Sequence, residues 1–100
     1  MKIDFERSGG FIGLRTTATI DTQALAEAES QHLHELIATA SFFDLPPYLT
    51  KTSLPVPDQF HYKVTIVDED QTHTVETNDV SAPDTLRALL RQLTHLARHS

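Results

Sequence analysis

The six histidines are the residues whose type most readily suggests chemistry, because imidazole is a common ligand of zinc. They fall into three pairs along the chain: His32 with His34, His61 with His73, and His95 with His99. The first pair would point to different sides of a helix, and the second would lie on opposite faces of a hairpin. The third pair could share a metal, but a zinc site takes three or four protein ligands. We therefore favour surface histidines and predict no metal of the protein's own, with the third pair as the alternative.

Nucleophilic and acid–base catalysis find little support in the sequence. Ser8 precedes two glycines, as in some nucleophile loops, but nothing marks a histidine partner for it. The acidic run of Asp68, Glu69 and Asp70 is typical of a solvated hairpin turn. The motifs GxSxG and HExxH, a phosphate-binding loop and a dinucleotide fingerprint are all missing, and the chain contains no cysteine. We predict a protein that is not an enzyme and needs no cofactor.

The carboxylate of Asp58 has a more promising setting, because it follows two prolines and precedes a predicted strand. Pro55 and Pro57 each fix one backbone angle and favour an extended conformation in the residue before them. We therefore expect Leu54 to Asp58 to form an exposed, partly pre-extended segment, which would lose less entropy on docking. Capping of the local backbone is the alternative role for Asp58.

The hexapeptide SGGFIG, residues 8–13, joins two predicted strands. Gly9, Gly10 and Gly13 are all the glycines of the protein, and they surround the large apolar residues Phe11 and Ile12. Two apolar side chains on a permissive loop favour insertion into another protein's pocket, although such residues also fold back onto their own core. The hexapeptide alone leaves both interpretations open.

The elements around these residues follow from the hydrophobic pattern. Alternating residues predict strands at 2–8, 14–21, 60–67 and 72–77, while apolar residues three and four apart predict helices at 24–40 and from 83 onward. The order β-β-α-β-β-α predicts one α+β domain over residues 1–100. We expect two layers, with a four-stranded antiparallel sheet of two hairpins under two helices. The strand order stays open, because either strand of one hairpin could pair with the other hairpin.

Composition narrows the classes of partner. The net charge is −6 and the eight Lys and Arg residues are scattered, which disfavours nucleic acid. No apolar run approaches the ~20 residues that span a bilayer, and the first residues do not resemble a secretion signal. We expect a cytoplasmic protein, without membrane attachment, that is a monomer when free; an exposed edge strand would permit dimerisation.

Five motifs in order give the chain a resemblance to one family: SGGFIG, SFFDLP, PDQFHYKVTI, HTVE and APDTLRALLRQL. Together they resemble emfourin, an inhibitor of protealysin-type metalloproteases. The resemblance implies a small bacterial protein that blocks thermolysin-like zinc proteases, often beside a protealysin-like partner enzyme. It also implies that two neighbouring loops, one apolar and one carrying an Asp, enter the enzyme's cleft.

Carried onto this sequence, the resemblance makes Asp58 a candidate ligand of the enzyme's zinc. Phe11 and Ile12, helped by Leu54 and Val56, would fill the apolar substrate pockets. The remaining expected contacts are Gly9, Gly10, Gly13 and Pro57. The alternative is a non-inhibitory interaction domain in which Phe11 and Ile12 are buried in the protein's own core.

Overall fold

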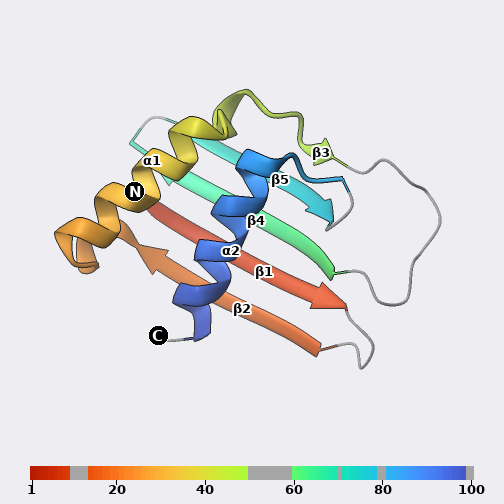
Figure 1. Ribbon diagram of the computed structural model, residues 1–100, viewed down its shortest axis with the longest axis horizontal. Helices are drawn as coiled ribbons and strands as arrows, with labels where there is room; N and C mark the ends of the chain where they lie inside the picture. The colour runs from red at the N-terminus through yellow and green to blue at the C-terminus, as the bar shows by residue number, and fades with distance from the viewer. Residues whose placement is uncertain (10–13, 50–59, 70, 79–80, 99–100) are drawn as a thin grey trace.

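The computed structural model describes residues 1–9, 14–49, 60–69, 71–78 and 81–98. This part of the chain forms a sheet and helices arranged in two layers (Figure 1). The strands are β1 (Lys2–Gly9), β2 (Leu14–Asp21), β3 (Tyr48–Leu49), β4 (Phe60–Asp68) and β5 (Gln71–Asn78). The α-helices are α1 (Glu27–Thr39) and α2 (Asp84–Arg98), and two short 3₁₀ helices are η1 (Thr22–Ala24) and η2 (Phe42–Asp44).

The strand order in the sheet is β2-β1-β4-β5-β3. The two predicted hairpins, β1 with β2 and β4 with β5, are confirmed, and antiparallel pairing of β1 with β4 joins them. The prediction of a four-stranded, wholly antiparallel sheet is wrong. The short strand β3 pairs parallel to β5, with Tyr48 opposite Glu76, so the sheet is five-stranded and mixed.

Proline explains the additional strand. Pro46 and Pro47 cannot continue a helix, and they favour extended backbone. The carbonyl of Pro47 accepts a hydrogen bond from the backbone N–H of Glu76 at 2.8 Å, which aligns the chain with the edge of β5. Two extended residues are too short a pattern to be recognised by alternation.

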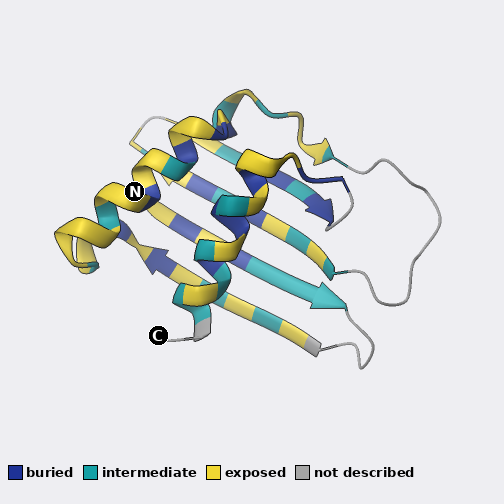
Figure 2. Cartoon of the chain, in the orientation of Figure 1, coloured by how far each residue is buried: buried dark blue, intermediate teal, exposed yellow. Residues whose placement is uncertain are grey.

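Both α-helices cover the same face of the sheet, and the hydrophobic core lies between the two layers (Figures 1 and 2). The alternation predicted for the strands is confirmed: inward side chains are buried in the middle of the sheet and half-buried toward the strand ends, and their neighbours face the other side. The core residues of the four long strands are Ile3, Phe5, Ile20, Val64, Ile66 and Val75. Those of the helices and the segments beside them are Leu33, Ile37, Phe42, Ala82, Leu86, Leu89, Leu90 and Leu93.

The first α-helix begins later than its sequence suggests. The helix was predicted over residues 24–40. Instead, Asp21 accepts a hydrogen bond from the N–H of Gln23 at 3.0 Å and caps the 3₁₀ helix η1. Leu25 then returns to extended backbone, and α1 starts at Glu27. None of the helices described here is both long and apolar enough to cross a membrane.

Candidate functional site

Three strand ends meet at one end of the sheet and position the two segments of interest. Gly9, the last residue of β1, lies opposite Leu14 of β2 and opposite Phe60 of β4. Residues 10–13 therefore connect two of these strand ends, and residues 50–59 lead into the third. Leu49, which precedes residues 50–59, lies opposite Thr77 near the end of β5. Both segments are thus anchored at the same end of the sheet (Figure 1).

Among the nine residues predicted to contact a protease, the described part contains Gly9. The others lie outside the described residues: Gly10, Phe11, Ile12, Gly13, Leu54, Val56, Pro57 and Asp58. Their roles stay predictions, and so does the exposure of the two apolar side chains that would separate the inhibitor from the non-inhibitory interaction domain. The anchoring positions agree with the expectation that the two segments are neighbours.

Gly9 has a backbone conformation that its residue type explains. Its φ is 107°, in the left-handed region where a β-carbon would clash. The strand β1 therefore ends in a residue that can turn where others are strained. This supports the expectation that glycine shapes the start of residues 10–13.

The side chains of Arg7 on β1 and Phe60 on β4 contact each other near the strand ends that flank residues 10–13 and 50–59. The guanidinium carbon of Arg7 lies 3.7 Å from the centre of the Phe60 ring, well within the range of a cation–π contact. Below them Phe5 and Tyr62 pack with ring centres 6.2 Å apart. Arg7 was not among the candidate residues, although its place in the alternation with Ile3 and Phe5 puts it on the inward face.

The described chain that precedes residues 50–59 is held by β5. His73 Nε2 donates to the carbonyl of Leu45 at 2.7 Å, which fixes the proton on that nitrogen because a carbonyl only accepts. The ring also packs edge-on against Phe42, with ring centres 5.6 Å apart. Farther along, the Thr77 hydroxyl donates to the carbonyl of Leu49 at 2.8 Å. His73 and Thr77 thus tether the chain at Leu45 and Leu49, the latter being the last described residue before residues 50–59.

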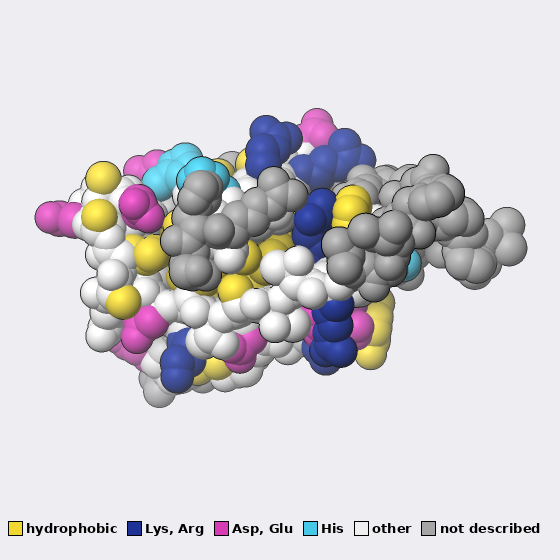
Figure 3. Space-filling model, turned by 90° about the horizontal axis from the view of Figure 1, so that it is seen from below, with side chains coloured by type: hydrophobic (Ala, Val, Ile, Leu, Met, Phe, Trp, Pro, Cys, Tyr) yellow, Lys and Arg dark blue, Asp and Glu magenta, His cyan; other side chains and the backbone are white. Residues whose placement is uncertain are grey.

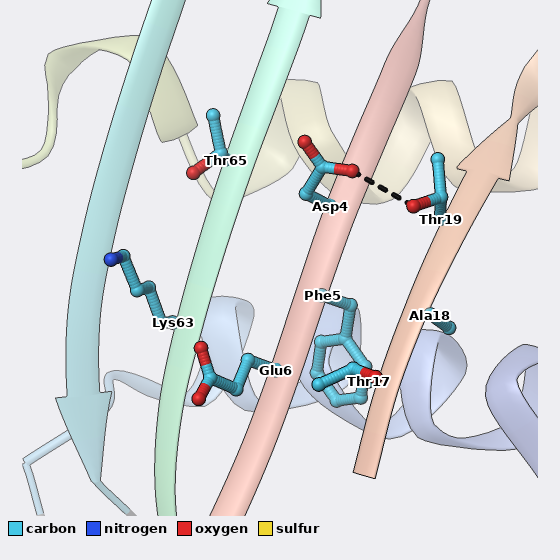
Figure 4. Close-up of a pocket in the computed structure, with 8 residues that line it drawn as sticks. All are labelled: Asp4, Phe5, Glu6, Thr17, Ala18, Thr19, Lys63 and Thr65. Carbon is cyan, nitrogen blue, oxygen red and sulfur yellow. Dashed lines mark hydrogen bonds between the residues drawn. The ribbon is translucent and has the colours of Figure 1, made fainter.

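The face of the sheet without helices is polar and shallowly hollowed. A hollow of about 500 Å³ is lined from β1, β2 and β4, and its side chains stand side by side in Figure 4. Asp4 accepts a hydrogen bond from Thr19 at 3.0 Å, and Glu6 pairs with Arg15 at 2.7 Å. Carboxylates satisfied by neighbouring Thr and Arg side chains are typical of a solvated sheet face. Among the residues that the structure describes, no three His, Asp or Glu side chains are grouped to hold a metal.

Basic side chains lie near the anchored end despite the negative net charge. Arg7, Arg15 and Lys63 occupy the last rows of the sheet before Gly9, Leu14 and Phe60. Figure 3 shows several Lys and Arg side chains gathered toward one end of the molecule. This end of the molecule is therefore not part of a uniformly acidic surface.

Comparison with known families gives one match: the family model for Emfourin covers residues 5–94. The chain belongs to the emfourin family. No curated protein and no solved structure matches it. The resemblance drawn from the five motifs is confirmed by the family match. The match extends from β1 into α2, so both anchored segments lie within the emfourin region.

Emfourin is a family of inhibitors, and membership implies a protease-inhibitor role in general. A protease is accordingly the kind of partner that the family suggests. Membership in an inhibitor family is also consistent with the expectation that the chain is not an enzyme.

Proposed function

We propose that this emfourin-family protein inhibits a thermolysin-like or protealysin-like zinc metalloprotease by placing two neighbouring segments in the enzyme's cleft. The observation that carries the proposal is the position of Gly9 between Leu14 and Phe60 in adjacent strands. Residues 10–13 therefore begin, and residues 50–59 finish, at the same end of a packed sheet. A rigid support for two short segments lowers the entropy lost on binding.

Asp58 is the proposed ligand of the enzyme's zinc. A carboxylate oxygen binds zinc at about 2.0 to 2.2 Å, and a catalytic zinc keeps one position for water. Displacing that water removes the nucleophile that attacks the peptide bond. The zinc belongs to the enzyme, and Asp58 stands two residues before Phe60, the first residue of β4.

Phe11 and Ile12 are proposed to fill apolar pockets beside the metal, with Leu54 and Val56 as further contacts. A large apolar anchor in a desolvated pocket commonly carries much of the binding free energy of an interface. Gly9, Gly10, Gly13 and Pro57 would let the backbone of the two segments follow the cleft. One chain would then occupy one cleft as a monomer.

Titration of enzyme activity tests the proposal. A protealysin-like and a thermolysin-like protease are assayed on a peptide substrate with increasing amounts of the protein, and a serine protease serves as the control. Stoichiometric loss of metalloprotease activity alone is the expected result. Full activity of both metalloproteases at micromolar protein would contradict the proposal and favour the non-inhibitory interaction domain.

A further inference from the structure

We propose that Arg7 is a positioning residue, which holds the two inhibitory segments in one fixed arrangement through its contact with Phe60. Arg7 lies two residues before Gly9 and Phe60 lies two residues after Asp58. The guanidinium carbon of Arg7 lies 3.7 Å from the centre of the Phe60 ring, so the contact joins the strand before one segment to the strand after the other. The inference rests on the proposed function, because it assigns a role within that same site.

The setting of Arg7 argues against a purely structural contact. The inward positions before it on β1 are filled by Ile3 and Phe5, and an apolar residue at position 7 would continue that pattern. Instead the Nε of Arg7 is buried, and the described residues provide no hydrogen-bond acceptor for it. A buried donor without an acceptor normally costs stability. The favourable counterpart in this structure is the stacking of the guanidinium on Phe60.

The position of the contact explains why two segments would need it. Gly9, Leu14 and Phe60 form the last described row of backbone pairing, and the contact between Arg7 and Phe60 lies across these last rows. The helices pack over the other half of the sheet, while β1, β2 and β4 extend past them (Figure 1). A side-chain contact between β1 and β4 therefore stabilises the strand ends where helix packing does not. Held strand ends reduce the conformational freedom that binding would otherwise remove.

The test compares Arg7→Met with Arg7→Lys in the intact protein. Methionine keeps an unbranched side chain of similar reach without the charge, whereas lysine keeps a cation above the ring. We expect Arg7→Met to weaken metalloprotease inhibition about fivefold and Arg7→Lys to recover part of that loss. The melting temperatures of both variants should stay near that of the parent. Arg15→Leu, at the same end of the sheet but exposed, is the matched control and should leave inhibition within about twofold.

A double-mutant cycle tests whether Arg7 and Phe60 act on inhibition through one shared contact or contribute independently. Phe60→Leu should weaken inhibition about as much as Arg7→Met, and the double variant should be little worse than either, because both remove one contact. Additive effects of the two substitutions would overturn the proposal. The proposal would also be overturned if Arg7→Met inhibited as strongly as the parent. An equal loss of inhibition in Arg7→Met and Arg7→Lys would overturn it too.

Amide hydrogen exchange in the free protein gives a readout that does not depend on inhibition. We expect Arg7→Met to exchange faster at residues 9–14 and 58–60, with exchange in α2 unchanged. Unchanged exchange at both segments would overturn the positioning role. If the parent inhibits no metalloprotease, the proposed function fails, while the exchange result still decides whether Arg7 fixes the two segments.

Discussion

The two ends of the sheet are built differently. At the end covered by both helices, Ile3, Ile20 and Ile66 form one row across three strands, and all three are buried. At the other end the corresponding row is Gly9, Leu14 and Phe60, which borders the segments with the proposed contacts. The first end has apolar packing and the second has a cation–π contact and a left-handed glycine. Under the proposed function, stability and binding would be carried by separate regions, and substitutions can test that separation.

The largest effect on folding is expected from Leu89→Ala, at the helix-covered end. Leu89 lies on α2 and is fully buried in the core. Removing its side chain should lower the free energy of unfolding by about 3 kcal/mol, through lost burial and the cavity left behind. Denaturant unfolding measures the change, and Leu96→Ala on the half-buried last turn of α2 should cost less. The folded fraction of Leu89→Ala should inhibit like the parent; weaker inhibition by that fraction would contradict separate regions.

Asp58→Ala is expected to have the largest effect on inhibition. It would remove the proposed zinc ligand, and losing one partner of a desolvated charged contact commonly costs about 3 kcal/mol, or about a hundredfold in the inhibition constant. The unfolding midpoint should be unchanged, because Asp58 precedes the first residue of β4 and does not belong to the hydrophobic core of the described residues. Asp68→Ala, at the opposite end of β4 from Phe60, is a control that removes the same charge away from the site. An Asp58→Ala protein as potent as the parent would eliminate the zinc-ligand role.

Phe11→Ala should weaken inhibition less than Asp58→Ala, by about thirtyfold. A buried aromatic anchor carries about 2 kcal/mol of binding free energy, which corresponds to that factor. The inhibition constant and the melting temperature are measured together, because they distinguish the two interpretations of the hexapeptide. A large loss of stability with little change in inhibition would place Phe11 in the protein's own core. A loss of inhibition below threefold would remove it from the contact.

The long elements could be predicted from the sequence because each has a repeated signal. Alternation over eight or nine residues fixed the inward face of β1 and β4, and leucines three and four apart fixed the core face of α2. The strand order could not be predicted, because hydrophobic alternation does not distinguish which edges of two hairpins pair. Strand β3 was missed because two residues carry no period.

The chemistry of the proposed site stays a prediction from the sequence, and the structure describes the strand ends on either side of it. The glycines and prolines marked the two segments, since those residues constrain or free the backbone locally. The Arg7 contact with Phe60 depends on the pairing of β1 with β4, which joins residues 53 positions apart, so no local pattern could show it. The tether between His73 and Leu45 is long-range for the same reason.

The smallest effect on stability and inhibition is expected from removing the ion pair of Arg15 with Glu6. This pair serves as the comparison for Arg7 on the neighbouring strand. The two groups are 2.7 Å apart, but the Arg15 side chain is 66% exposed. Solvent screening limits such pairs to about 0.5 kcal/mol, and the contribution should fall as salt is added. Arg15→Leu should therefore change the unfolding midpoint only slightly, and inhibition by no more than about twofold. A loss of inhibition as large as that of Arg7→Met would show that charge at this end, and not the stacking on Phe60, governs binding.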